Sequence, residues 1–149
     1  MKTLAFINLK GGVGKTVSAA NVAHILATVH HKKVLLVDAD KQGNASRYFR
    51  LYGEQDGTAA LLGTEVAEIA TTIYPTQYKG LDIITSNMEL YSADREMYDS
   101  PADVCRVLAE TLSIVQNDYD FCIIDNCQRR FEIVRKRRRN FVVFRRGGG

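Results

Sequence analysis

The chain has 149 residues, of which 46% are hydrophobic and 25% charged, a composition typical of a globular protein with one compact domain. No apolar run approaches the roughly 18 residues of a membrane span, and the first residues lack the regions of a signal peptide, so we expect a cytoplasmic protein. The net charge of +3 conceals an asymmetry, because residues 128–149 carry eight Arg and one Lys against one Glu, a charge of +8, which leaves −5 for the first 127 residues.

The first predicted unit is a strand, a glycine-rich loop, a helix and a second strand. Residues 3–8 (TLAFIN) are a short apolar run that ends at the loop, which is typical of a buried parallel strand. The helix begins at Lys15, and residues 34–37 (VLLV) form the next strand, which ends at Asp38. In such a unit the loop lies at the carboxyl ends of the strands, where open α/β sheets bind ligands. The apolar residues expected to pack this helix on the sheet are Val22, Ile25, Leu26 and Val29.

Further elements alternate along the rest of the chain. Short helices are predicted near 45–52 and 58–62, strands at 81–85 and 121–124, and a helix that begins at Ser100 and Pro101 with its apolar face at Val104, Val107, Leu108, Thr111, Leu112 and Val115. The last of these strands ends at Asp125. This alternation predicts an α/β fold with a doubly wound, mainly parallel sheet and helices on both faces.

Residues 10–16 (KGGVGKT) carry the clearest chemistry. Glycines let backbone N–H groups turn around phosphate oxygens, and the following helix adds the positive end of its dipole. Lys15 would contact the β- and γ-phosphates, and the Thr16 hydroxyl would ligate Mg²⁺. The strict P-loop motif needs glycine where this chain has Leu9, but the variant K-G-G-x-G-K-T fits in full. The predicted phosphate-binding residues are Lys10, Gly11, Gly12, Val13, Gly14, Lys15, Thr16 and Val17.

This loop, with its extra Lys10, resembles that of the ParA/Soj/MinD family of deviant Walker A ATPases. Residues 34–46 (VLLVDADKQGNAS) are similar to the family segment D-x-D-P-Q-G-N, and residues 81–90 (LDIITSNMEL) resemble its later strand followed by Ser-Asn. The resemblance covers about residues 1–127. It implies a P-loop NTPase-type fold, C-terminally truncated in this chain, with ATP and Mg²⁺ as cofactors.

The resemblance also implies roles for single residues in catalysis. Lys10 would reach the phosphates of the partner subunit in a homodimer bridged by ATP, Lys15 would bind the phosphates within its own subunit, and Asp40 would orient the attacking water. Residues 42–44 would form a switch that senses the γ-phosphate. Lys41 stands where the family has proline, which bears on the rigidity of this switch.

The implied magnesium region consists of Thr16, Asp38 and Asp125. Asp125 resembles the Walker B carboxylate that holds the hydration shell of the ion, and Asp38 would support the same region. Val17 replaces the threonine that is common after Lys15 in the family, which predicts weaker nucleotide affinity rather than loss of binding.

The implied function is that of a Mg-ATP-dependent ATPase of plasmid or chromosome partitioning. Such a protein dimerises with ATP, binds DNA nonspecifically on the nucleoid and acts with a ParB-like centromere-binding partner. Two alternatives stay open: a fragment that binds nucleotide without turnover, and a MinD-like membrane-associated positioning ATPase. The second would need an amphipathic C-terminal helix, and we do not expect membrane binding.

Residues 128–149 differ from the rest of the chain, with dense arginine, no clear continuation of helix or strand, and a triple-glycine end. They are open to three interpretations: an arm that contacts nucleic-acid phosphates, a basic membrane-surface segment with residues 141–144 as its apolar anchor, or the product of a shifted reading frame. We favour the last, because composition, charge and motif agreement all change after Cys127. The prediction is therefore a nucleotide-binding domain at residues 1–127 and an atypical tail at 128–149.

Overall fold

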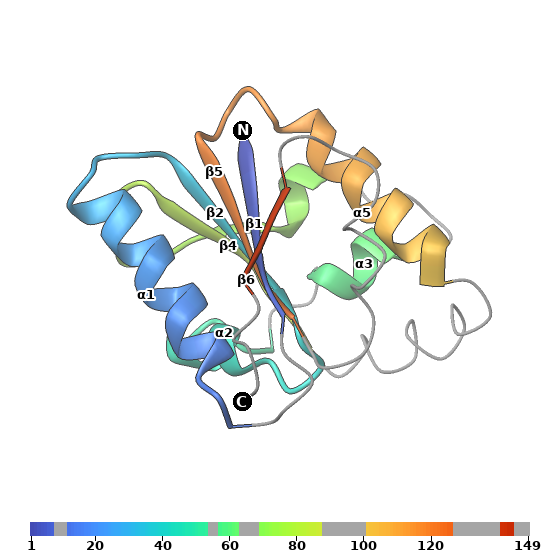
Figure 1. The fold of residues 1–149 in the computed structure, drawn as a ribbon, viewed down its shortest axis with the longest axis horizontal. Coiled ribbons are helices and arrows are strands. Elements are labelled where there is room, and N and C mark those ends of the chain that lie inside the picture. Colours follow the sequence, from blue (N-terminus) through green and yellow to red (C-terminus); the bar gives the residue numbers. More distant parts are fainter. Residues whose placement is uncertain (8–11, 54–56, 63–68, 88–100, 127–140, 145–149) are drawn as a thin grey trace.

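A computed structural model describes residues 1–7, 12–53, 57–62, 69–87, 101–126 and 141–144 of the chain (Figure 1). The predicted α/β architecture is confirmed. In chain order the elements are β1 (Lys2–Phe6), α1 (Lys15–Thr28), β2 (Val34–Ala39), α2 (Asn44–Tyr48), α3 (Thr58–Leu62), the 3-10 helix η1 (Ile69–Thr72), β3 (Ile73–Pro75), β4 (Leu81–Ile84), α5 (Pro101–Ile114), β5 (Phe121–Asn126) and β6 (Phe141–Phe144).

The six strands form one sheet in the order β3-β4-β2-β5-β1-β6. All neighbouring pairs are parallel except β3 with β4, so the sheet is mainly parallel as expected. The strands of the first predicted unit, β1 and β2, run parallel, but β5 lies between them. The register places Asp38 of β2 directly beside Asp125 of β5, at the carboxyl ends of both strands.

Helices α1 and α2 cover one face of the sheet, which Figure 1 shows on the opposite side from α3 and α5. The expected packing face of α1 is only partly correct. Val22 and Leu26 are partly buried against the sheet, but Ile25 and Val29 are 46% and 64% exposed. The residues of α1 that are buried are Ala19, Ala20, Ala23 and Ala27. Their small side chains allow the helix backbone to approach the sheet closely, which leaves the larger apolar residues on its flanks and outer side.

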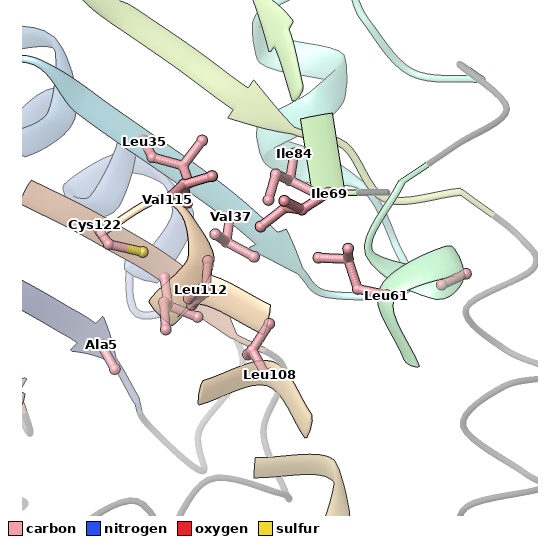
Figure 2. Packing of buried hydrophobic residues seen from close by; sticks show 12 residues of the cluster. Ala5, Leu35, Val37, Leu61, Ile69, Ile84, Leu108, Leu112, Val115 and Cys122 are labelled. Atoms are coloured by element: carbon pink, nitrogen blue, oxygen red, sulfur yellow. The ribbon is translucent and has the colours of Figure 1, made fainter. Parts of the chain in front are cut away.

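The other face of the sheet carries the second half of the core, which Figure 2 shows from close by. Leu108, Leu112 and Val115, from α5 and the turn after it, pack over the central strands, with Ile69 and Leu61 beside them. This confirms the apolar face predicted for these residues. Both faces of β2 and β5 are therefore covered, which explains why their sequences are continuous apolar runs rather than alternating ones.

The atypical tail contributes a strand that the sequence did not lead us to expect. Residues 141–144 (FVVF) form β6, which pairs in parallel with β1 from Thr3 beside Phe141 to Phe6 beside Phe144. Two phenylalanines and two valines favour an extended conformation, and four such residues suffice to pair with β1. Residues 127–140 and 145–149 lie outside the described residues, so the domain boundary after Cys127 stays a prediction.

Among the described helices, none combines the length and the apolar character that crossing a membrane requires.

Candidate nucleotide site

The site begins at the loop that precedes α1. Gly12 and Gly14 have φ values of +71° and +82°, a left-handed conformation that residues with a side chain rarely adopt. Gly14 is the N-cap of α1, no side chain caps the helix, and the Gly14 carbonyl accepts the first helical hydrogen bond from Ser18 N at 2.8 Å. The first turn therefore offers backbone N–H groups and a positive dipole end to an anion. Lys10 and Gly11 lie outside the described residues.

Asp125 is the most unusual group near this helix end. Its side chain is 1% exposed, and neither carboxylate oxygen has a hydrogen-bonding partner of good geometry among the described residues. Burial raises the pKa of Asp125 to about 7; the nearby Thr16 hydroxyl and Lys15 ammonium lower it, whereas Asp38 and Asp40 raise it. The fold thus brings the predicted Thr16, Lys15, Asp38 and Asp40 around one buried carboxylate.

Asp38 is buried as well, but its carboxylate is fully engaged. Its Oδ2 accepts hydrogen bonds from the Ser46 backbone N–H at 2.8 Å and from the Ser46 hydroxyl at 2.7 Å, and its Oδ1 accepts one from Asp40 N at 3.2 Å. Burial raises the pKa of Asp38 to about 6, although the bonds from Ser46 and Asp40 lower it. Of the two adjacent carboxylates, that of Asp125 alone has both oxygens without hydrogen-bonding partners when the described residues are considered.

Asp40 begins the turn that leads into α2. Its Oδ1 accepts a hydrogen bond from Gln42 N at 3.0 Å, and its backbone carbonyl accepts one from Gly43 N at 2.8 Å. Gly43 has a φ of +59°, and a Cβ there would overlap the ring of Tyr52. Arg47 stacks on the same ring at 3.6 Å from its centroid. The predicted switch, residues 42–44, is therefore folded against Tyr52 in this structure.

Three polar residues of the site were absent from the sequence-based prediction. Ser46 accepts a hydrogen bond from Ser86 N at 2.8 Å, and the Thr58 hydroxyl donates to the Asp38 backbone carbonyl at 2.7 Å. Ser46 is the last residue of the quoted segment, residues 34–46, so its proximity to the aspartates was the available signal. Thr58 and Ser86 come from other parts of the chain, and only the fold brings them here.

A magnesium ion fits this donor set. The uncoordinated carboxylate of Asp125 and the hydroxyl of Thr16 are oxygen ligands of the kind that Mg²⁺ prefers. No three side chains of the His, Cys, Asp or Glu type gather tightly enough to hold a metal in the part of the chain that the structure describes. The ion would therefore need further oxygens from water and phosphate, as Mg²⁺ sites usually do. Of the remaining residues predicted to bind phosphate, Val13 in the loop is half-buried and Val17 in α1 is 60% exposed.

Comparison with known proteins shows which family the chain is similar to. A family model described as an AAA domain matches residues 1–134. The chromosome-partitioning ATPase Soj of Treponema pallidum is 40% identical over 124 residues, which cover 83% of this chain and 47% of Soj. The virulence plasmid ParA family protein pGP5-D of Chlamydia psittaci is 37% identical over 128 residues, covering 84% of this chain and 48% of that protein. The chain spans about half the length of the curated relatives it matches.

Solved structures of related proteins share the fold of this chain. Apo McdA of Cyanothece superimposes with a TM-score of 0.75 at 30% identity, over 85% of this chain and 49% of McdA. An ATP complex of a McdA variant superimposes with a TM-score of 0.74 at 29% identity, over 84% of this chain and 47% of McdA. The matched half of these proteins therefore has the same fold as this chain.

Proposed function

The chain belongs to the ParA/Soj/MinD family of P-loop ATPases, and from that premise we propose that it binds ATP with Mg²⁺ at the N-terminus of α1 as part of a plasmid- or chromosome-partitioning system. The observation that carries this proposal is the buried Asp125 carboxylate next to Thr16, whose two oxygens have no hydrogen-bonding partner of good geometry among the described residues. Burying a carboxylate without partners is costly, and a hard cation at this point would offset the cost.

Each residue of the site has a proposed role. The N–H groups around Gly12, Gly14 and the first turn of α1 would bind the phosphates, with Lys15 on the β- and γ-phosphates. Thr16 and Asp125 would hold the ion and its bound water. Bound Mg²⁺ would neutralise charge on the phosphate oxygens.

The acidic residues of β2 would act around this ion. Asp38 would support the magnesium region indirectly, through its hydrogen bonds with Ser46 and Asp40. It would not contact the ion, because both of its oxygens already accept hydrogen bonds. Asp40 would orient the attacking water. In the structure it accepts a bond from Gln42 N, so nucleotide binding would have to reorient this turn or use its other oxygen.

The wider activity is proposed from the family. Lys10 would contact the phosphates of a second copy, so that ATP bridges a homodimer, and the dimer would bind DNA nonspecifically on the nucleoid with a ParB-like partner. A binding-only activity is the second candidate, because the Asp40 carboxylate accepts a hydrogen bond from Gln42 N in this structure. The MinD-like alternative is disfavoured, because residues 141–144, its proposed apolar anchor, pair with β1 as a strand.

The first test is thermal unfolding of the 149-residue chain with and without Mg-ATP. A ligand that binds only the folded state at one hundred times its Kd stabilises it by about 2.7 kcal/mol, which corresponds to a shift of a few degrees. We expect this shift in the wild type and not in Lys15→Ala. Lys79→Ala, which removes an exposed lysine from the β3–β4 connection, is the matched control and should retain it.

Phosphate release then separates turnover from binding alone. Turnover that rises with the square of protein concentration would support the ATP-bridged dimer, and a gel-shift assay with random-sequence DNA tests the proposed DNA binding. Absence of any shift with Mg-ATP in the wild type would refute the proposed nucleotide site.

A further inference from the structure

Ser46 stands at the centre of the hydrogen bonds that surround Asp38. It is fully buried in α2, and both its backbone N–H and its hydroxyl donate to one oxygen of the Asp38 carboxylate, at 2.8 and 2.7 Å. Its hydroxyl oxygen also accepts the bond from Ser86 N at 2.8 Å. A single hydroxyl thus connects the end of β2 with the end of β4.

We propose that Ser46 is a positioning residue of the nucleotide site, which holds the turn of residues 40–44 in place by tying the Asp38 carboxylate to the end of β4. This inference rests on the proposed function. It deepens that function by naming what sets the geometry of the turn expected to sense the γ-phosphate.

The backbone of the turn is hydrogen-bonded to the Asp38 carboxylate. The Oδ1 of Asp38 accepts from Asp40 N, and Asp40 in turn accepts from Gln42 N and Gly43 N. The position of the Asp38 carboxylate therefore sets where the Asp40 backbone lies. Because Ser46 supplies both bonds to the other oxygen, it fixes the rotation of that carboxylate.

On its opposite side, the turn is held by packing and by one longer hydrogen bond. Gly43 lies against the ring of Tyr52, on which Arg47 stacks, and the Arg47 Nε donates to the Gln42 carbonyl at 3.3 Å. Arg47 is exposed, and such surface contacts are weak. The buried bonds of Ser46 are therefore the stronger restraint on the turn.

Two polar residues, Thr85 and Ser86, follow β4 beside Ser46. Both are fully buried, and neither hydroxyl has a hydrogen-bonding partner in the part of the chain that the structure describes. The side-chain hydrogen bond at the end of β4 is therefore the one that the Ser46 hydroxyl accepts from the Ser86 amide. Removing this hydroxyl would leave a buried amide without its acceptor and a buried carboxylate without one of its donors.

The test compares Kd for Mg-ATP and Mg-ADP, measured by calorimetry, in the wild type and in Ser46→Ala. A residue that positions the γ-phosphate-sensing turn should matter more for ATP than for ADP. We expect roughly a tenfold loss of affinity for Mg-ATP, as for the loss of one hydrogen bond to a charged group, with a much smaller loss for Mg-ADP. Ser46→Thr, which keeps the hydroxyl, should recover the ratio.

Ser113→Ala is the matched control, because this hydroxyl in α5 donates to a carbonyl of its own helix, that of Glu110. Hydrogen exchange on the nucleotide-free chain gives an independent readout: Ser46→Ala should speed exchange of the Ser86 amide about tenfold or more and leave the Ile83 amide in β4 unchanged. If Ser46→Ala does not unfold cooperatively, Ser46→Cys serves in its place, as it keeps the size and weakens the bonds.

The outcomes separate the two levels of the proposal. Equal weakening of both nucleotides, or an unchanged Ser86 amide, would refute the positioning role while nucleotide binding by the wild type stood. Wild-type protein that binds neither nucleotide would refute the proposed function and this role with it.

Discussion

Replacing Asp125 with asparagine should make the nucleotide-free protein more stable. The pKa of this carboxyl is raised from 3.8 to about 7 in the folded state, chiefly by burial. Each pKa unit is worth about 1.4 kcal/mol, so the charged group opposes folding by about 4 kcal/mol at most above pH 7. Asparagine is similar in shape and uncharged, and its amide could donate to the neighbouring carboxylates. We expect a gain of about 2–4 kcal/mol at pH 8.

The raised pKa of Asp125 also determines how the free energy of unfolding changes with pH. Between pH 7 and pH 4 the folded state takes up a proton on Asp125 that the unfolded state does not, so the opposition to folding disappears as the pH falls. The gap between the wild type and Asp125→Asn should shrink to less than half by pH 5 and close near pH 4. Asp38, whose pKa is raised to about 6, is present in both proteins, so the difference between them reports mainly on Asp125.

Urea unfolding at pH 5, 6, 7 and 8 measures this gap, with the exposed Asp118→Asn as control. The variant should also lose most of the stabilisation that Mg-ATP gives the wild type, if Asp125 holds the hydration shell of the ion. The reasoning would be refuted if the variant were less stable than the wild type at pH 8. It would also be refuted if the difference in free energy of unfolding did not narrow towards pH 5, because burial would then not disfavour the charged carboxylate.

Two further predictions concern packing close to the site. Gly57→Ala should destabilise the fold by about 2–3 kcal/mol, because the new Cβ would overlap the backbone carbonyl of Thr85, a group that cannot rotate away; an unchanged urea midpoint would refute this contact. Ala23→Leu should cost about 1–3 kcal/mol by overpacking the buried face of α1, whereas Ile25→Ala on its exposed side should change the free energy of unfolding by less than about 1 kcal/mol. Equal effects of these two substitutions would mean that α1 packs through its large residues after all.

Periodicity and turn signals located most elements because the strands are buried on both faces. The runs VLLV and FCII sit in the centre of the sheet, and the expected strands and helices fall within a few residues of the observed ones. The packing face of α1 could not be predicted in the same way, since helical periodicity gives most weight to large apolar residues. Here the alanines, which contribute little to such a pattern, are buried, and Ile25 and Val29 are not.

Sequence motifs identified the aspartates of the site but not their different states. Asp38 and Asp125 both follow apolar strands, and nothing in either segment indicates that one carboxylate is engaged and the other is not. That difference depends on Ser46 and on the register that places the two strands side by side. Residues distant in sequence, such as Thr58 and Ser86, enter the site only through the fold.

The order of the strands has a consequence for self-association. At one edge of the sheet, β3 has three residues and ends at Pro75, which has no N–H to donate, so this edge is a poor template for an added strand. At the other edge, β6 occupies the outer side of β1. A chain cut before residue 141 would leave β1 with a row of unpaired backbone groups, which invites edge-to-edge aggregation. Residues 141–144 therefore cover the β1 edge of the sheet.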